Sequence, residues 1–317
     1  MEYVYLDWNV IQYMKHSTVR DSINGPEFNN LINRLSKKYK FPFSEGHLKD
    51  LAISFNPDNQ QNIKSDLEYL NNLSQGYALG IIGPTEKILP TNNVNIYNFF
   101  KKIVSETQEE PDIKLSGGSY SVDMNILPKD DIFRPFLERS GGILDSDVMT
   151  EFLQHMWLSM DDPEHYKKFR IQVADIKKSL NNRDTILNKK SEYAKKLIPF
   201  LDFITSEQPE NYLHNFDDVI KSFCHINGRS FDDMTIGGKI ELSYMLLDFH
   251  PKFKDKINKK NRPSNIMRDC KNLYFASQAK YYVTEDSSTT KKAKFVCSAL
   301  SLKVKITTMS EFMSKFC

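Results

Sequence analysis

Short hydrophobic runs near the two ends of the chain predict the strands of an α/β sheet. Residues 3–7 are rich in Val and Tyr, and residues 39–43, 281–284 and 304–307 have the same character. Between and after these runs, apolar residues recur at helical spacing, which predicts helices directly after residues 7 and 44 and at 27–40, 269–280, 290–300 and 309–316. Strands joined by helical crossovers of this length pair in parallel. We therefore expect a parallel sheet flanked by helices.

The middle of the chain has a different pattern. Strand signals are sparse there, and long helical patterns occur at 63–75, 96–107, 147–159, 164–181, 185–206, 211–225 and 237–248. We therefore predict an α/β core that is split between residues 1–60 and 262–317. Residues 61–261 are predicted to form a mainly helical insertion or lid, part of which completes the core.

The composition is that of an ordinary globular protein. Of 317 residues, 40% are hydrophobic and 26% are charged, which is enough to build a substantial core. No run of about 18 apolar residues predicts a membrane span, and the first strand follows no signal-type segment. The four cysteines are scattered without a Cys-x-x-Cys pair, as in proteins of a reducing compartment. We expect a cytoplasmic protein without a membrane partner.

Charge alone does not identify a partner. The net charge of +2 neither demands nor excludes nucleic acid, although basic residues cluster at 252–262 and at 291–294. A lysine run is usually a solvated face. These two runs flank Asp269 and Asp286 in the sequence, and phosphate contacts need cations beside a site rather than a basic protein overall.

Four aspartates far apart in sequence form the candidate chemistry of the chain. Asp7 and Asp286 come directly after predicted strands, where an open parallel sheet holds its functional groups. Asp50 lies about two turns into a helix that Ser44 is suited to cap, and Asp269 is expected to open a helix. Gathered carboxylates repel one another unless a cation neutralises them. The pattern indicates a site for Mg²⁺ or Mn²⁺.

The order of these motifs resembles that of a PIN domain. The resemblance lies in Tyr5-Leu6-Asp7-Trp8-Asn9, in the segment from Ser44 to Leu51, in Asp269 with its helix, and in Val283-Thr284-Glu285-Asp286. It covers residues 1–60 and 262–317. The resemblance implies that Asp7, Asp50, Asp269 and Asp286 are both the metal ligands and the catalytic residues. Asp50 departs from the family pattern, which has a glutamate at this position, so its shorter side chain must approach the metal more closely or act through water.

The resemblance also implies an activity. PIN-like proteins are nucleases that cut RNA, or sometimes DNA, with Mg²⁺ or Mn²⁺. We therefore expect an endoribonuclease in which a metal-activated water attacks phosphorus, leaving a 5′-phosphate and a 3′-hydroxyl. RNA is favoured over DNA as the substrate, and the resemblance permits a toxin or defence effector. The helical insertion offers a site for a protein regulator.

Four further residues are candidates for supporting roles. Asn9 is expected to orient a metal-bound water, and Thr284 to hydrogen-bond a carboxylate and hold its rotamer. His47 is expected either to pair with Asp50 or to touch substrate, while Glu45 suits the first turn of its helix with or without a catalytic duty.

Other interpretations of the same residues stay open. Each aspartate could be only a helix cap, a turn residue or a surface residue. The chain could be a catalytically inactive PIN-like module that binds protein or RNA, or a helical interaction protein whose strands close a scaffold. A haloacid-dehalogenase-like enzyme also uses an aspartate at a strand end, but its Asp-x-Asp-x-Thr motif is not matched after Asp7. Convergence of the four carboxylates in space distinguishes the nuclease from these alternatives.

Overall fold

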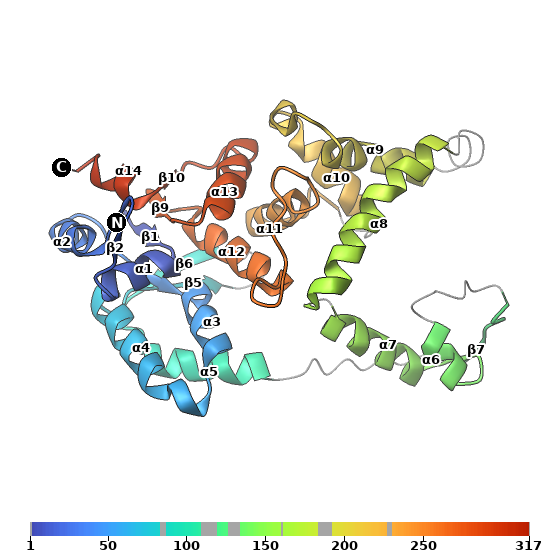
Figure 1. The fold of residues 1–317 in the computed structure, drawn as a ribbon, viewed down its shortest axis with the longest axis horizontal. Coiled ribbons are helices and arrows are strands. Elements are labelled where there is room, and N and C mark those ends of the chain that lie inside the picture. The colour runs from blue at the N-terminus through green and yellow to red at the C-terminus, as the bar shows by residue number, and fades with distance from the viewer. Residues whose placement is uncertain are drawn as a thin grey trace. The chain divides into compact units, whose positions relative to one another are not determined.

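A computed structural model gives the structure of this protein and describes residues 2–82, 87–108, 119–125, 134–159, 161–182, 192–226 and 230–316. The chain divides into two compact units (Figure 1). The first unit consists of residues 1–107, 170–256 and 265–317, and the second of residues 108–169 and 257–264. The four candidate aspartates all belong to the first unit.

A parallel sheet joins the two ends of the chain. Strands β1 (Val4–Leu6), β9 (Tyr281–Val283) and β10 (Lys305–Thr307) pair in the order β1-β9-β10, and both pairings are parallel. In this register Tyr5 lies opposite Tyr282. The predictions of an α/β fold and of a parallel sheet are thus confirmed.

A second sheet is formed by β4 (Phe43–Ser44), β5 (Ala78–Ile82) and β6 (Lys87–Thr91). Strand β4 pairs with β5 in parallel, and β5 pairs with β6 antiparallel. A single parallel bridge between Tyr3 and Lys40 connects this sheet to β1. Strands β5 and β6 were not predicted, because Gly and Pro interrupt their hydrophobic runs.

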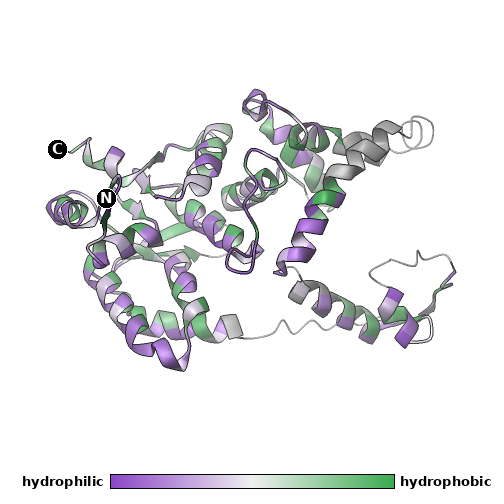
Figure 2. Ribbon diagram, in the orientation of Figure 1, coloured by the Kyte–Doolittle hydropathy of each residue, from purple (hydrophilic) through white to green (hydrophobic). Residues whose placement is uncertain are grey.

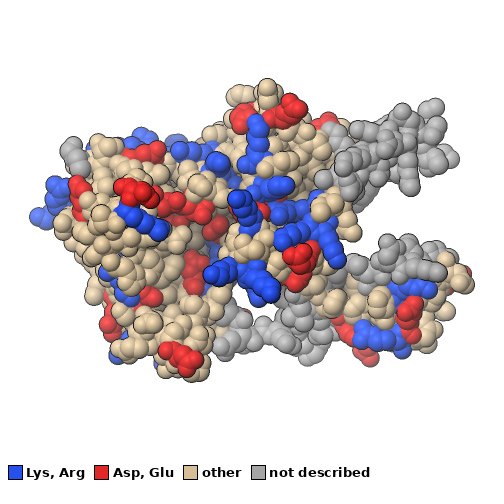
Figure 3. All heavy atoms as spheres, in the orientation of Figure 1, with Lys and Arg blue, Asp and Glu red and all other residues tan. Residues whose placement is uncertain are grey.

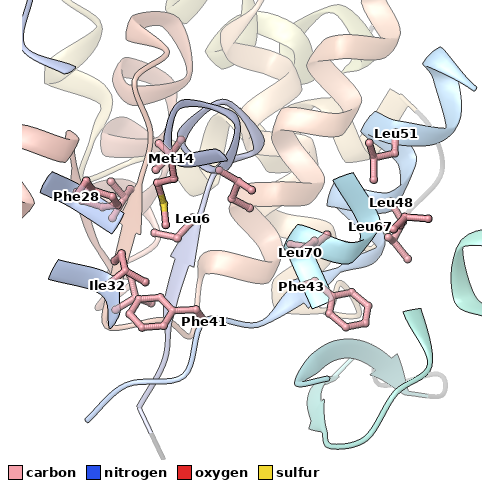
Figure 4. Packing of buried hydrophobic residues seen from close by; sticks show 14 of the residues in the cluster. Leu6, Met14, Phe28, Ile32, Phe41, Phe43, Leu48, Leu51, Leu67 and Leu70 are labelled. Carbon is pink, nitrogen blue, oxygen red and sulfur yellow. The ribbon is translucent and has the colours of Figure 1, made fainter. Parts of the chain in front are cut away.

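Helices bury their apolar sides against these strands. The N-terminal ones are α1 (Trp8–Lys15), α2 (Gly25–Leu35), α3 (Glu45–Ser54), α4 (Gln60–Ser74) and α5 (Ile96–Gln108). These helices carry hydrophobic and hydrophilic residues on different sides, as Figure 2 shows. The shared core includes Leu6, Met14, Phe28, Ile32, Phe41, Phe43, Leu48, Leu51, Leu67 and Leu70 (Figure 4). Helices α4 and α5 therefore complete the core built on the terminal strands.

Two of the candidate acids lie on or beside the C-terminal helices. These helices are α12 (Pro263–Ala276), which contains Asp269, α13 (Ser287–Ala299), which directly follows Asp286, and α14 (Met309–Met313). Asp286 caps α13, because its Oδ1 accepts a 2.6 Å hydrogen bond from the Thr289 amide. Asp269 was expected to open its helix, and this is wrong. Helix α12 begins at Pro263, a residue suited to the first helical turn, so Asp269 lies about two turns further on.

The remaining elements follow the predicted helical pattern of the middle segment. The first unit contains α8 (Pro163–Asn182, which begins in the second unit), α9 (Glu192–Ile204), α10 (Phe216–Ile226) and α11 (Ile236–Leu247), the hairpin β2 (Val19–Arg20) and β3 (Ile23–Asn24), and the 3₁₀ turns Pro57–Asn59 and Pro209–Tyr212. The predicted helix 185–206 lies partly outside the described residues. The second unit contains β7 (Tyr120–Ser121), α6 (Arg134–Arg139), β8 (Ile143–Leu144) and α7 (Ser146–Ser159), with a small core of its own. Within the described part of the chain, no helix has both the length and the apolar character to cross a bilayer.

Candidate active site

Neighbouring parallel strands bring Asp7 and Asp286 to one edge of the sheet. Asp7 follows β1, and its amide donates a 2.9 Å hydrogen bond to the carbonyl of Val283 at the end of β9. Asp286 follows β9 after a short turn. Thr284 links the two, since its hydroxyl donates to Asp7 Oδ2 at 2.7 Å and accepts from the Asp286 amide at 3.2 Å. Thr284 therefore makes the carboxylate hydrogen bond that the sequence predicted.

The Asp7 carboxyl is buried and held from both sides. Its Oδ1 accepts a 2.8 Å hydrogen bond from the Trp8 amide, so Asp7 also caps α1. Burial raises the pKa of Asp7 from 3.8 to about 7, the negative charges of Asp50 and Asp286 add to the rise, and the Thr284 hydrogen bond opposes it. Asp7 is thus a helix cap, and the charges of two other candidate acids act on its buried carboxyl.

Asp269 projects from α12 toward the same group of acids. Part of its surface remains accessible to solvent. Removal from water raises its pKa well above the ordinary value, and the negative charges of Asp7, Asp286 and Asp50 raise it further. The other three candidate aspartates, each from a different element, thus lie close enough to Asp269 for their charges to act on it.

The Asp50 carboxylate lies beside a positively charged side chain. The Arg268 guanidinium on α12 donates from Nε to Asp50 Oδ1 at 2.8 Å, joining residues of α3 and α12. Burial raises the pKa of Asp50, while the charge and hydrogen bond of Arg268, together with a hydrogen bond from Asn272, oppose the rise. The short side chain of Asp50 is thus engaged by an arginine.

The donor chemistry of this cluster suits a divalent cation. Carboxylate oxygens are the ligands that Mg²⁺ and Mn²⁺ prefer, and a bound cation would offset both the burial of Asp7 and Asp269 and the nearby negative charges. Among the described residues, however, no three His, Cys, Asp or Glu side chains form a group ready to hold a metal ion. The four carboxylates therefore do not stand at the spacing of a formed coordination shell.

A buried hydrogen-bond network joins the elements that carry the candidate acids. The Tyr5 hydroxyl on β1 donates to Asn272 Oδ1 at 2.8 Å and shares a 2.6 Å hydrogen bond with the Ser44 hydroxyl. Gly46 allows this contact, because a Cβ at this position would stand 2.1 Å from Asn272 Oδ1. The network ties β1, α3 and α12 together at the positions where each presents an acid.

His47 has a structural role that differs from both predictions made for it. It is fully buried, its Nδ1 accepts from the Ser44 amide at 3.1 Å, and its Nε2 lies 2.7 Å from the Leu6 carbonyl. Burial lowers its pKa to about 4, so the ring is neutral and donates from Nε2. His47 closes the capping box of α3 and fastens that helix to β1, while Asp50 pairs with Arg268 instead.

The two other supporting candidates lie at the edge of the site. Asn9 is the second residue of α1 rather than part of a continued strand, and its side chain is exposed. Capping by Asp7 starts this helix at once, in agreement with the helical pattern predicted directly after residue 7. Glu45 lies in the first turn of α3 and forms an ion pair with Lys49.

Sequence reasoning missed several residues of the site. Arg268 and Asn272 escaped notice, although they are four residues apart on α12, a spacing that puts two side chains on the same face of a helix. Tyr244 on α11 and Tyr282 on β9 were also missed. Both tyrosines are fully buried, their hydroxyls have no well-formed hydrogen bond within the described structure, and both have pKa values raised well above 10, first by burial and then by nearby groups that include Asp269.

No family model, no curated protein and no solved structure matches this chain.

Proposed function

We propose that this protein is a metal-dependent nuclease that hydrolyses phosphodiester bonds, with RNA as the favoured substrate. The observation that carries the proposal is the gathering of Asp7, Asp50, Asp269 and Asp286 from four separate elements. Burial raises the pKa of Asp7 and of Asp269, and the negative charges of other acids of the cluster raise both further. Burying like charges together is costly. A cluster that only capped helices would not need to gather its acids in this way.

The four aspartates are the residues that would hold the cation, Mg²⁺ or Mn²⁺. When bound, such a cation supplies neutralising charge and a water of lowered pKa for attack on phosphorus. Thr284 keeps the Asp7 carboxylate oriented, whereas the Arg268 guanidinium holds Asp50 Oδ1 and has to be displaced from it by the cation. Asp286 is exposed, so a phosphate in solution can approach it. Attack by water leaves a 5′-phosphate and a 3′-hydroxyl.

Basic residues beside the cluster favour a nucleic-acid substrate. The segment 251–256 carries three exposed lysines, Lys252, Lys254 and Lys256. It contacts α13 through Asp255, which accepts a hydrogen bond from Ser288 two residues after Asp286. Figure 3 shows Lys and Arg side chains gathered over the region of α11 and α12. Cations placed beside buried acids can bind the backbone phosphates on either side of the one that is cut.

The strand arrangement supports a PIN-like core as part of this proposal. Strands β4, β9 and β10 each follow a helix in the chain, and β9 pairs in parallel with both β1 and β10. The acids stand after β1, on α3, on α12 and after β9. This is the arrangement that the resemblance implies.

A second function is favoured by the Asp50–Arg268 ion pair. The guanidinium provides positive charge at a place where a metal-binding site needs a free carboxylate. A PIN-like module that binds RNA or protein without cleaving it would retain such a pair. The two functions differ in whether a divalent cation changes the chemistry of bound nucleic acid.

The experiment is a cleavage assay on the purified full chain. End-labelled single-stranded RNA and DNA are incubated with Mg²⁺, with Mn²⁺ or with EDTA, and the product ends are identified. We expect cleavage of RNA that requires the cation and falls roughly 100-fold or more in Asp7→Asn, since each carboxylate of a metal site contributes several kcal/mol to the transition state. The matched control is Asp58→Asn, an exposed aspartate outside the cluster.

The same experiment separates the candidate functions. Cation-dependent cleavage that survives Asp7→Asn would place the activity elsewhere or in a contaminant. Tight RNA binding without cleavage under any cation would instead support the non-catalytic module.

A further inference from the structure

A buried lysine lies close to the acidic cluster and plays no part in the proposed chemistry. Lys292 on α13 has no exposed surface, and its ammonium forms ion pairs with Asp248 Oδ1 at 2.9 Å and with Asp255 Oδ2 at 2.6 Å. The sequence placed Lys292 in a run with Lys291 and Lys294. Those two are exposed, whereas the helical period turns Lys292 inward.

The partners of Lys292 belong to a closed network. Asp248 ends α11 and is itself fully buried; its Oδ2 accepts from Arg170 on α8 at 2.9 Å. Asp248 Oδ1 also accepts from the Asp255 amide at 2.8 Å, and Arg170 donates to the Asp255 carbonyl at 3.1 Å. Two cations thus hold two carboxylates at the ends of the 248–255 loop. Buried ion pairs of this kind fix geometry more than they add stability.

The network touches the helix turn that bears Asp286. Ser288, two residues beyond Asp286, donates its hydroxyl to Asp255 Oδ1, and Lys292 binds the other oxygen of the same carboxylate. Helix α13 is therefore held to the loop at two points, once in its first turn and once in the turn that follows. Asp286 caps that first turn through the Thr289 amide.

The network also contacts α11 and, through it, α12, the helix that carries Asp269. The Tyr244 ring on α11 lies 5.2 Å from the Lys292 ammonium. A second ion pair, Lys271–Glu241 at 3.3 Å, joins α12 to α11.

We propose that Lys292, with Asp248 and Asp255, is a positioning cluster that holds the N-terminal turn of α13, and so Asp286, against the other acids. The proposal rests on the proposed nuclease function. It makes residues 236–256, which the sequence assigned to an insertion or lid, a fixed part of the catalytic core. Lys292 acts only through its partners and touches no reacting atom.

The test combines local hydrogen exchange with kinetics on the full chain. In Lys292→Met, amide exchange across 287–292 is expected to speed up at least tenfold, while β1 and β9 exchange as in the wild type. With Mg²⁺ and RNA, kcat is expected to fall about tenfold with KM close to the wild-type value, because the acids are misplaced while the binding surface is kept. The matched control is Lys102→Met, since Lys102 pairs with Glu106 on the exposed side of α5 and is 70% exposed.

Two further variants keep the proposal falsifiable if Lys292→Met does not fold. Ser288→Ala removes only the hydrogen bond to Asp255 and is expected to loosen the same turn by a smaller factor. Asp255→Asn retains Lys292 and the shape of the Asp255 side chain, removes the charge that pairs with Lys292, and is expected to loosen the same turn.

The outcomes separate this inference from the proposed function. Unchanged exchange at 287–292 in both Lys292→Met and Ser288→Ala would overturn it, as would loosening spread evenly over the whole first unit. Local loosening in a protein that cleaves no nucleic acid, even as wild type, would leave the positioning cluster standing and refute the nuclease.

Discussion

The Thr284 hydroxyl donates a 2.7 Å hydrogen bond to the Asp7 carboxylate, across the junction of two parallel strands that are 277 residues apart in the chain. The same hydroxyl accepts from the Asp286 amide. One small side chain therefore sets the orientation of one acid and the backbone that carries another. Its removal is a direct way to ask whether the site depends on Asp7 being ionised.

Thr284→Val keeps the shape of the side chain and deletes both hydrogen bonds. Because the lost bond favours the ionised form of Asp7, its pKa is expected to rise above about 7 by roughly one to two units, the equivalent of about 1.5–3 kcal/mol. The acidic limb of the pH–rate profile should then move to higher pH by a similar amount. Thr91→Val, at an exposed position of β6, is the control. An unshifted acidic limb would show that Asp7 does not govern it.

Asp7 also predicts how stability depends on pH. Its pKa is about 7 in the folded protein against 3.8 ordinarily, so between these values the folded state holds a proton that the unfolded state has lost. Stability from this group is therefore greatest below pH 4, falls as the pH rises toward 7, and is level above that. From pH 5 to pH 8 the loss is roughly 3 kcal/mol.

Asp7→Asn should remove this dependence. The free energy of unfolding is measured by urea denaturation in EDTA at pH 5, 6, 7 and 8. Relative to the wild type, that of Asp7→Asn is expected to increase by roughly 3 kcal/mol between pH 5 and pH 8. Parallel curves for the two proteins would contradict the raised pKa. Added Mg²⁺ should restore wild-type stability at pH 8 and leave Asp7→Asn little changed, since a cation replaces the proton.

A substitution of Gly46 tests the close contact between α3 and α12, the helices that carry Asp50 and Asp269. In Gly46→Ala the new methyl group would meet Asn272 Oδ1 at 2.1 Å, so α3 and α12 must separate or the Tyr5–Asn272 hydrogen bond must break. We expect a loss of about 1–3 kcal/mol in the free energy of unfolding, as for other overpacked sites. Gly141→Ala is not a suitable control because its φ is +67°, whereas Gly80→Ala in β5 meets nothing closer than 4.0 Å and serves well. Equal stability of the two variants would contradict the tight contact.

Local signals account for what the sequence predicted well. Asp7, Ser44 and Asp286 each stand between a hydrophobic run and a helical pattern, and each is found capping the helix that follows. Such caps depend on residues within one turn, so the sequence contains them in full. The strand that begins at Tyr281 and the helices of the middle segment were also predicted from local signals, namely the spacing of their hydrophobic residues.

Contacts between distant residues account for what was missed. Arg268 meets Asp50 across 218 positions, and no local pattern selects that partner among the other acids. Lys292 sits in a run typical of a solvated surface, yet it is buried because two aspartates 37 and 44 residues away neutralise it. The start of α12 was misplaced because Asp269 is a plausible cap, while Pro263 supplies the real beginning.

Arg268 offers the sharpest test between the two proposed functions. If the protein is a nuclease, the Arg268 guanidinium competes with the cation for Asp50, and Arg268→Gln frees the carboxylate. Binding of Mn²⁺, followed by calorimetry, is then expected to tighten at least severalfold, because a competing positive charge beside a ligand has been removed. Arg134→Gln is the matched control, since Arg134 forms its ion pair with Glu138 in the second unit.

The opposite outcome has its own physical reason. In a non-catalytic module, Arg268 is the permanent counter-charge of Asp50, which lies in a largely buried setting. Arg268→Gln would then leave that carboxylate unpaired and destabilise the fold by about 3 kcal/mol without creating a Mn²⁺ site. Loss of stability together with unchanged weak Mn²⁺ binding would therefore argue against the nuclease. Tighter Mn²⁺ binding at little cost in stability would argue for it.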